Sequence, residues 1–236
     1  MAELTLHFED YDQTGYLIRF GHKEHLEQIL NGKIRFTSLK KYQRDENTNI
    51  GDVNEGVCTF LYQNDDLEIT FSHPLLEHGK EIYISKSITS FKDYPDNKKY
   101  VSCFSYFTMK DIVEKAIVTE QVLAEKEWNS VLILINSDVF RKVVLETLQS
   151  YNANFGKIQY LDYSINQRNL NEFTKSKEYI HQKEIRFSIE YKGEQSSVIN
   201  AINSDVLEID LNQTFKGIII PTADINKCFT IVNKES

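Results

Sequence analysis

The longest uninterrupted apolar run in this chain of 236 residues is five residues long and covers residues 131–135, Val-Leu-Ile-Leu-Ile. That length fits a buried β-strand, and it is far below the roughly 20 residues of a membrane-spanning helix. The chain also has three prolines, no internal repeat and no low-complexity tract. We therefore expect one α+β domain over residues 1–236, in which a few helices pack on a curved or split, mostly antiparallel sheet.

Most of the remaining pattern is that of short strands, in which apolar and polar residues alternate between turn residues. Strands are also predicted at residues 16–20, 33–37, 57–62, 67–71, 81–88, 100–107, 156–163, 184–191, 206–211 and 217–220. Apolar spacing predicts helices at residues 26–30, 112–117 and 139–148, with Ser137 as the cap of the last helix. Residues 166–179 are polar and are expected to be helical or irregular. Residues 38–56 lack apolar periodicity, so a long loop with a functional role is expected there.

The net charge of −8 argues against broad, sequence-independent binding of nucleic acid, which requires a basic surface. One stretch is an exception, because five basic residues occur in it with no acidic residue between them: Lys33, Arg35, Lys40, Lys41 and Arg44. Two interpretations remain open for this basic stretch. Its residues are either a solvated surface or an anion-binding site.

The positions of cysteine and histidine predict neither a disulfide nor a metal site. The three cysteines are far apart among apolar or β-branched neighbours, and we interpret them as free thiols: Cys58, Cys103 and Cys228. The histidine pairs, His22 with His25 and His73 with His78, have no carboxylate or cysteine at ligand spacing. The chain begins Met-Ala-Glu-Leu, without the basic and apolar segments of a secretion signal, so we expect a cytoplasmic protein that does not contact a membrane.

A late strand begins at Glu184, where apolar residues alternate with Arg186, a serine and a second glutamate. On an extended chain Gln182 and Glu184 lie on one face, because they are two residues apart. There the amide can fix a ligand by hydrogen bonds while the carboxylate orients a nucleophile. The alternative is that Glu184 is solvated or forms a cross-strand ion pair and has no catalytic role.

The order of these features resembles a large family of poorly characterised bacterial proteins. The shared marks are an early strand with an aromatic residue and an arginine, a helix, a short aromatic-serine strand, a Cys-Phe-Ser strand, and a late strand with glutamate and arginine. In this chain they correspond to residues 16–20, 26–32, 35–38, 103–105 and 183–187. The similarity extends over residues 16–221 through short motifs.

The opening unit is also similar to the start of ADP-ribosyltransferases, including toxins that modify DNA or RNA. The resemblance implies an ADP-ribosyltransferase-like fold and NAD as the substrate. In that family an arginine or histidine on the first strand contacts NAD, a serine, threonine or tyrosine lies on a second element, and a late glutamate is catalytic. Position by position, Arg19 takes the first role and Glu184 the third, while Ser38, Tyr42 and Ser105 are alternatives for the second.

With Glu184, Gln182 completes a Gln-x-Glu signature that is associated in ADP-ribosyltransferases with amide or guanine acceptors. The sequence also departs from the pattern of these enzymes. The first strand carries no histidine before a threonine, and a Tyr-Phe-Thr run follows the Cys-Phe-Ser segment where Ser-Thr-Ser is typical. The single tryptophan, Trp128, is not in the motif expected after that segment.

The chemistry of NAD cleavage suggests a role for each candidate. Breaking the nicotinamide–ribose bond passes through an oxocarbenium-like state, which the carboxylate of Glu184 would stabilise. The planar guanidinium of Arg19 suits the pyrophosphate or ribose. The residues expected at the nicotinamide are Thr37, Ser38 and Ser105 by hydrogen bonds and Tyr42, Phe20 or Phe36 by stacking. For the two phenylalanines, the alternative is a place in the hydrophobic core.

Three functions follow as hypotheses. The leading one is an NAD-dependent ADP-ribosyltransferase, a toxin or antiviral effector that modifies nucleic acid or protein. The second is an NAD glycohydrolase on the same fold, with water as the acceptor. The third is a non-catalytic module that senses a nucleotide or inhibits a partner protein. The sequence does not indicate an oligomeric state.

Overall fold

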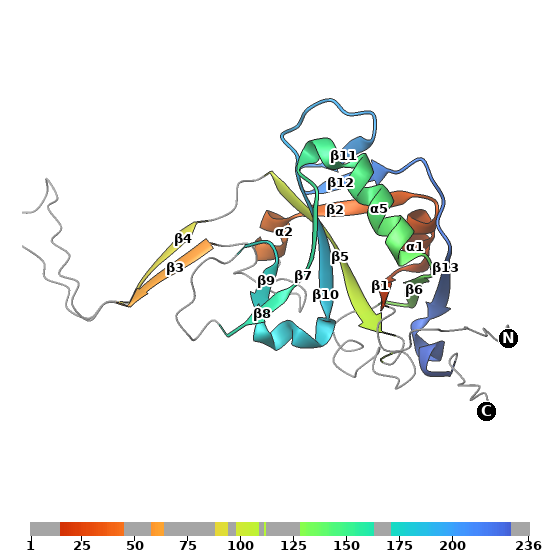
Figure 1. The fold of residues 1–236 in the computed structure, drawn as a ribbon, viewed down its shortest axis with the longest axis horizontal. Helices are drawn as coiled ribbons and strands as arrows, with labels where there is room; N and C mark the ends of the chain where they lie inside the picture. The colour runs from red at the N-terminus through yellow and green to blue at the C-terminus, as the bar shows by residue number, and fades with distance from the viewer. Residues whose placement is uncertain are drawn as a thin grey trace, which may run out of the picture.

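The computed structural model describes residues 15–44, 58–63, 88–93, 98–108, 111, 128–162 and 171–227. In these ranges the chain has an α+β fold, in which a few helices accompany a mostly antiparallel sheet (Figure 1). The fold class expected from the sequence is therefore confirmed at this level. None of the described helices is long and apolar enough to cross a membrane.

Nine of the described strands form the main sheet, and all of their pairings are antiparallel. They are β1 (Gly15–Gly21), β2 (Lys33–Ser38), β5 (Lys99–Thr108), β6 (Ser130–Leu134), β7 (Asn154–Lys157), β10 (Glu184–Glu190), β11 (Ile199–Asn203), β12 (Val206–Asp210) and β13 (Gly217–Pro221). Two smaller sheets pair β3 (Cys58–Gln63) with β4 (Ile88–Asp93), and β8 (Gln159–Leu161) with β9 (Thr174–Ser176). Only the β8–β9 pair is parallel in the described part of the chain.

The described helices are short. The α-helices are α1 (Lys23–Leu30), α2 (Leu39–Arg44) and α5 (Ser137–Thr147), and the 3-10 helices are η1 (Gln149–Tyr151), η2 (Lys177–Gln182) and η3 (Thr222–Lys227). The turn after α1 requires Gly32, whose φ of +81° is a left-handed conformation that other residues adopt at a cost.

The main sheet branches at β5, its longest strand. One edge of β5 pairs with β10, which in turn pairs with β7. The other edge pairs with two strands in succession, since Val101 is opposite Thr37 of β2 and Ser105 is opposite Ile18 of β1. We call the stretch of β5 between Val101 and Ser105 the fork. From it the sheet continues through β2, β12 and β11 on one side and through β1, β6 and β13 on the other (Figure 1).

The hydrophobic core lies between one face of the sheet and the helices α1 and α5. Phe104 of β5, Phe140 of α5 and Phe187 of β10 pack edge to face, with ring centroids 5.5 to 5.9 Å apart. Such aromatic contacts add to the stabilisation from the buried area itself. The alternation of β10 follows from this packing, because Ile185 and Phe187 face the core and the residues between them face the opposite side.

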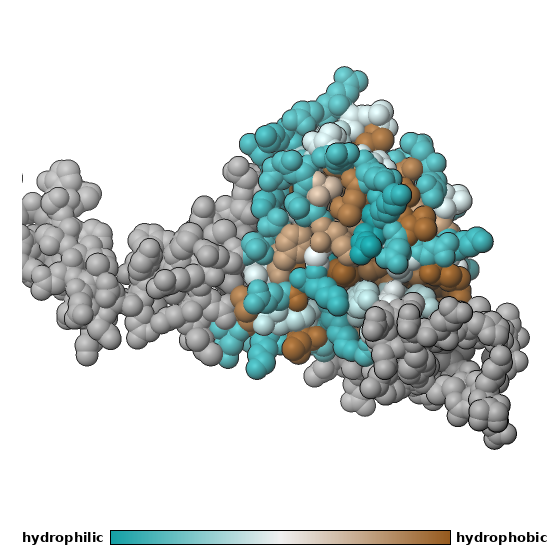
Figure 2. Space-filling view, viewed as in Figure 1, coloured by the Kyte–Doolittle hydropathy of each residue, from teal (hydrophilic) through white to brown (hydrophobic). Residues whose placement is uncertain are grey.

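The outer surface is mostly hydrophilic on the side shown in Figure 2, with apolar patches between polar side chains. Four large apolar side chains are exposed among the described residues. Ile135 lies just before α5 and Val139 near its start, whereas Ile180 lies in η2 and Ile202 in β11. Isolated apolar residues of this kind are ordinary on a protein surface and do not indicate a binding site.

The predicted strands agree with the structure at 16–20, 33–37, 57–62, 100–107, 131–135, 184–191, 206–211 and 217–220, within two residues at each end. The predicted strand at 156–163 is divided, because Ile158 separates β7 from β8 and the two pair with different partners. Strands β9 and β11 were not predicted, and β9 lies within residues 166–179, which were expected to be helical or irregular. Strand β4 overlaps the prediction only at Ile88. The strand at 67–71, most of that at 81–88 and the helix at 112–117 lie outside the described residues, as do His73, His78 and Cys228.

Two local predictions are wrong for identifiable reasons. Residues 39–44 form α2 and do not belong to a loop, because Ser38 begins the helix by accepting a hydrogen bond from the backbone nitrogen of Lys41 at 3.2 Å. Ser137 is the first residue of α5 and not its cap. Its hydroxyl accepts a hydrogen bond from the backbone of Leu17 and donates one to that of Leu134, so it links the helix to β1 and β6.

Candidate functional site

Glu184 is the first residue of β10, and its buried carboxylate lies between two buried cations. One oxygen accepts a hydrogen bond from Arg186 Nε at 2.5 Å, and the other accepts one from Lys175 Nζ at 3.2 Å. Arg186 is completely buried and Lys175 is 3% exposed. Isolated charges at such depth are very costly, so the three groups depend on one another for charge compensation. We call these three residues and their polar neighbours the Glu184 cluster.

Lys175 lies on β9 and brings Gln182 into the cluster. Its ammonium donates a hydrogen bond to Gln182 Oε1 at 2.8 Å and lies 4.6 Å from the centroid of the Tyr179 ring. Burial by itself lowers the pKa of Lys175, but the charge of Glu184 and the hydrogen bond to its carboxylate raise the pKa by more, so the net shift is upward. The ammonium therefore stays charged at neutral pH.

Gln182 and Glu184 meet at Lys175 for a reason other than the one predicted. The sequence suggested an extended chain from Gln182 to Glu184, where the strand begins. In the structure Gln182 ends η2, Lys183 has a φ of +43°, and the strand begins only at Glu184. The prediction of an extended segment is therefore wrong at Gln182, although the two side chains do contact the same ammonium.

Tyr160 of β8 contacts the backbone of the cluster. The N–H of Glu184 donates a hydrogen bond to the Tyr160 hydroxyl at 2.7 Å, and the carbonyl of Glu184 accepts one from the N–H of Ile158 at 3.0 Å. Burial raises the pKa of Tyr160, so its hydroxyl remains protonated. The sequence analysis did not identify Lys175 or Tyr160, because they precede Glu184 by 9 and 24 residues and no local pattern links them to it.

Strand β5 supplies further neighbours through its register with β10. Ser105 is directly opposite Glu184, and Cys103 is opposite Arg186, so all four side chains lie on the face of the sheet away from α5. Burial, the charge of Glu184 and a hydrogen bond to Glu184 together raise the pKa of Cys103 well above its usual range. Cys103 is a free cysteine, as predicted, and its thiol stays protonated.

The pKa of Tyr42, on α2, is also shifted. Burial raises it, and the charge of Glu184 raises it further, while the charges of Arg19 and Arg186 lower it. Of the three alternatives for the second catalytic position, Ser105 is therefore the one that strand register places opposite Glu184, and Tyr42 is a residue on which the charge of Glu184 acts.

The third alternative, Ser38, is engaged elsewhere. Its hydroxyl donates a hydrogen bond to Asp205 Oδ1 at 2.9 Å, and the residue is 2% exposed. Its backbone N–H also donates to the carbonyl of Asp205, so the side chain and the main chain are both held against the segment before β12. Its neighbour Thr37, which was expected near the nicotinamide, lies in β2 opposite Val101 and Val206.

Arg19 lies on β1 at the fork, where that strand leaves β5. By alternation it emerges on the core side with Leu17, opposite to Glu184, and its guanidinium carbon is 5.4 Å from the centroid of the Phe104 ring. Its charge nevertheless lowers the pKa of Tyr42 and of Cys103. The charge of Arg19 thus acts on two residues around the cluster, but no hydrogen bond joins Arg19 to Glu184.

Two buried guanidinium nitrogens have no hydrogen-bond partner in the described part of the chain: Nη1 of Arg19 and Nε of Arg35. Both arginines lie near His25 of α1, since Arg35 Nη1 is 3.1 Å from His25 Nε2 and both charges lower the pKa of this histidine. Partial burial is the first cause of that lowered pKa. Buried N–H groups without acceptors are rare and costly, so these nitrogens are where a ligand oxygen would be stabilised.

The two phenylalanines proposed for stacking are occupied by other contacts. Phe20 stacks on Trp128, with ring centroids 5.3 Å apart and an angle of 17° between the planes. Phe36 is fully buried in the core between the sheet and α5. For Phe36 the alternative interpretation, a core residue, therefore agrees with the structure. Tyr42 is then the predicted stacking residue on which the charge of Glu184 acts.

The basic stretch does not form one surface. Lys33 lies 3.9 Å from Glu208 in an ion pair, and Arg35 contacts His25. Lys40 lines a separate cavity of about 560 Å³ together with Lys98 and Lys192. The side chain of Arg44 lies outside the described residues.

No group of three or more histidine, cysteine or acidic side chains able to hold a metal ion occurs among the described residues. The polar groups of the Glu184 cluster include one carboxylate, two cations, the hydroxyls of Tyr160 and Ser105, and the thiol of Cys103. Such a set can bind polar groups and stabilise positive charge in a substrate. No protein-family model matches the chain, and no curated protein or solved structure is significantly similar to it.

Proposed function

We propose that this protein is an NAD-dependent ADP-ribosyltransferase with Glu184 as the catalytic carboxylate. One observation carries the proposal. The strands that carry Arg19, Ser105 and Glu184 are direct neighbours in the order β1, β5 and β10, and Ser105, one of the three alternatives for the second role, is opposite Glu184. These strands are far apart in the chain, so nothing in the local sequence pattern required them to be adjacent.

The proposed reaction breaks the bond between the anomeric ribose carbon and the nicotinamide nitrogen. Nicotinamide leaves with the bonding electron pair, and the ribose carbon acquires oxocarbenium character. The negative charge of Glu184 stabilises that carbon, while the two cations fix the orientation of its carboxylate. An acceptor nucleophile then bonds to the carbon and releases its proton, so the products are the ADP-ribosylated acceptor, nicotinamide and one proton.

The orphan nitrogen of Arg19 supports a phosphate contact at the fork. A pyrophosphate oxygen would supply the acceptor that Nη1 does not find among the described residues, and a guanidinium is well suited to phosphate. In this proposal Tyr42 would stack on the nicotinamide, and Gln182 would hold a polar group beside the carboxylate.

The second part of the proposal concerns the acceptor of the ADP-ribose group. A nucleic acid is favoured over a protein by the cavity that gathers Lys40, Lys98 and Lys192 on a chain of net charge −8. Lysines in such a concave site attract phosphate. A role as a toxin or antiviral effector is consistent with modification of nucleic acid, and it belongs to the same proposal.

A second candidate function is the non-catalytic module. The observation that favours it is that both oxygens of Glu184 already bind buried cations, which is how a purely structural ion-pair cluster also looks. A module of this kind would keep its ligand affinity without turnover. An NAD glycohydrolase differs from the transferase only in using water as the acceptor.

The test must separate loss of catalysis from loss of folding. Glu184→Gln alone leaves Arg186 and Lys175 buried without a counter-charge, and breaking such a pair costs about 3–5 kcal/mol. We therefore combine it with Lys175→Met, which removes one cation together with the anion. Lys99→Met is the matched control. It breaks the ion pair that Lys99 forms with Glu172 at 3.0 Å, a pair that does not include Glu184.

Each variant is incubated with labelled NAD, alone and with cellular RNA, DNA or protein, after circular dichroism has confirmed its fold. We expect the wild type and Lys99→Met to transfer label, and the double variant to lose at least about 100-fold of the rate. Free nicotinamide without transfer would indicate the glycohydrolase. Binding of NAD without turnover would indicate a module that senses NAD, and neither binding nor turnover would refute both enzyme interpretations.

A further inference from the structure

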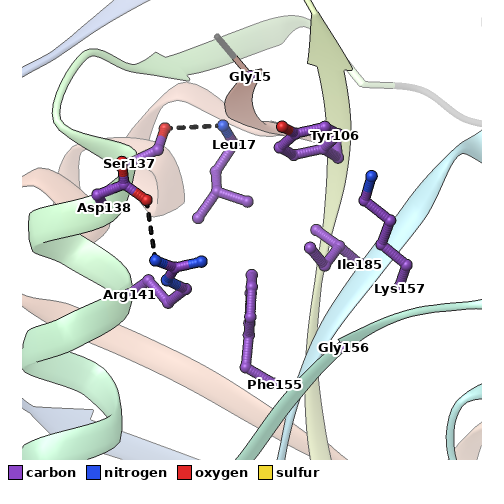
Figure 3. A pocket seen from close by; sticks show the side chains of 10 residues that line it. All are labelled: Gly15, Leu17, Tyr106, Ser137, Asp138, Arg141, Phe155, Gly156, Lys157 and Ile185. Atoms are coloured by element: carbon purple, nitrogen blue, oxygen red, sulfur yellow. Dashed lines mark hydrogen bonds and ion pairs between the residues drawn. The ribbon is translucent and has the colours of Figure 1, made fainter. Parts of the chain in front are cut away.

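A cavity of about 490 Å³ opens beside the N-terminal end of α5, between that helix and β1, β5, β7 and β10 (Figure 3). Its volume is within the range of sites for small organic ligands. The residues that line it are Gly15, Leu17, Tyr106, Ser137, Asp138, Arg141, Phe155, Gly156, Lys157 and Ile185. None of these residues was predicted from the sequence to bind a ligand.

The inner surface of the cavity is apolar and aromatic. Leu17 and Ile185 are buried side chains of the core, 2% and 3% exposed, and they line the cavity at its inner side. Half-buried rings of Tyr106 and Phe155 form part of the walls. Figure 3 shows both rings and the two aliphatic side chains around the same space. Such a surface favours a flat, apolar group of a ligand.

Each aromatic ring is accompanied by a cation. Lys157 Nζ is 4.3 Å from the centroid of Tyr106, and Arg141 Cζ is 5.7 Å from that of Phe155. Asp138 is the single carboxylate among the lining residues, and it forms an ion pair with Arg141 at 3.1 Å (Figure 3). The lining therefore carries one excess positive charge. Arginine has five N–H donors and lysine three, so both retain donors for a ligand.

Gly15 makes this arrangement of the wall feasible. A Cβ atom at residue 15 would lie 1.9 Å from Cζ of Tyr106, so any larger residue would displace the ring. The Tyr106 ring in turn lies under the Lys157 ammonium. The absence of a side chain at Gly15 thus fixes one aromatic wall and, through it, one of the two cations.

This cavity is separate from the Glu184 cluster. Ile185 lines it, and Glu184 is not among its lining residues. Successive residues of a strand point to opposite faces, so the cavity and the carboxylate lie on the two sides of β10. A ligand in the cavity therefore does not depend on the NAD chemistry proposed for Glu184.

We propose that the cavity binds a nucleoside monophosphate. The base lies against the aliphatic and aromatic surface of Leu17, Ile185 and Phe155, and the phosphate accepts hydrogen bonds from Lys157 and Arg141. Purely apolar ligands would make no use of the remaining N–H donors of Arg141 and Lys157, and inorganic anions would leave the apolar surface exposed. A nucleotide satisfies both parts of the cavity.

The probe is adenosine monophosphate, titrated into the full-length protein by isothermal calorimetry beside adenosine and inorganic phosphate. We expect Lys157→Ala to weaken the affinity for the nucleotide by about tenfold, the effect of losing one charge-assisted hydrogen bond, and to leave that for adenosine unchanged. Phe155→Leu should weaken both. The matched control is Lys142→Ala, which removes a neighbouring cation of α5 that is not among the lining residues.

Binding that persists in the Glu184→Gln, Lys175→Met double variant separates this site from the NAD site. Failure of the wild type to bind the nucleotide at millimolar concentration would overturn the proposal. Equal losses in Lys157→Ala and Lys142→Ala would do so as well, because they would show only a general effect of charge. Neither result would affect the test of NAD cleavage.

Discussion

Two arginines at the fork carry buried nitrogens for which the described residues offer no acceptor. Each such group costs about 1–3 kcal/mol when it is left unpaired. Arg19 and Arg35 come from neighbouring branches of the sheet, and both act on His25. This histidine is therefore a natural reporter of the charge at the fork.

The pKa of His25 should rise when one of these arginines is removed. It is lowered by partial burial and then by Arg35, so Arg35→Leu should shift it upward toward the ordinary value. Because the lowered pKa favours the neutral form, the unfolded state binds the proton more readily, and the contribution of His25 to stability is lost as the pH falls through about 6.5. The pKa is measured by NMR titration of the imidazole protons.

Lys23→Ala is the control for this titration, because Lys23 lies on the same helix but is not among the charges that shift His25. We expect no change of the pKa in that variant. An unchanged pKa in Arg35→Leu would contradict the proximity of the two side chains. A phosphate bound at the fork would raise the pKa of His25 in the wild type, which makes the same experiment a binding assay.

At the scale of elements, strands were predictable where alternation reports burial on one face. β10 is an example, because Ile185, Phe187 and Ile189 alternate with polar residues that face the other side. The segment before it was not predictable in the same way. β9 and η2 are too short to show a hydrophobic pattern. Lys175 is buried and forms an ion pair with Glu184, and no local sequence rule predicts a buried lysine there.

The turn between α1 and β2 should be highly sensitive to substitution. Gly32 has a φ of +81°, and a Cβ atom there would lie 2.2 Å from the carbonyl oxygen of Gln213. We expect Gly32→Ala to lower the free energy of unfolding by about 2–4 kcal/mol, since strain and collision add. Urea denaturation followed by circular dichroism measures this loss.

Gly193 provides the matched comparison for that experiment. Its φ is +86°, but a Cβ atom there would meet nothing within 4 Å. Gly193→Ala should therefore cost only the conformational strain, about 1–2 kcal/mol. Equal losses in the two alanine variants would show that the contact with Gln213 is not as close as described.

At the scale of the whole molecule, the branching of the sheet was beyond the sequence. A curved or split sheet was expected, but the pairing of β5 with β1, β2 and β10 depends on contacts between segments that are far apart in the chain. The same holds for the candidate site. The sequence predicted the site residues Glu184, Gln182, Ser105 and Tyr42. The side chains that surround them depend on the pairing of distant strands, which the sequence did not predict.

Strand β13 should be essential for the solubility of the whole molecule. It covers the outer edge of β6, whose five residues are all buried, and places Ile218 and Ile220 opposite Ile133 and Val131. A chain that ends at Lys216 would expose this apolar edge, so we expect aggregation upon expression. Light scattering of the purified chain measures it, and a synthetic peptide of residues 214–227 should restore the monodisperse state. A soluble truncated chain with an unchanged melting temperature would contradict this role.

The two-sided chemistry of β10 also limits how the chain can misfold. A slip of one residue against β5 would turn Glu184 and Arg186 toward Phe104 and Phe140, and Ile185 and Phe187 toward the ion pairs. Such a slip would destabilise both faces of the sheet. Charged side chains would enter the apolar layer, and apolar side chains would take the place of the charged partners on the other face. The ion pairs at the start of β10 thus favour the correct register of this strand against β5, whatever ligand the protein binds.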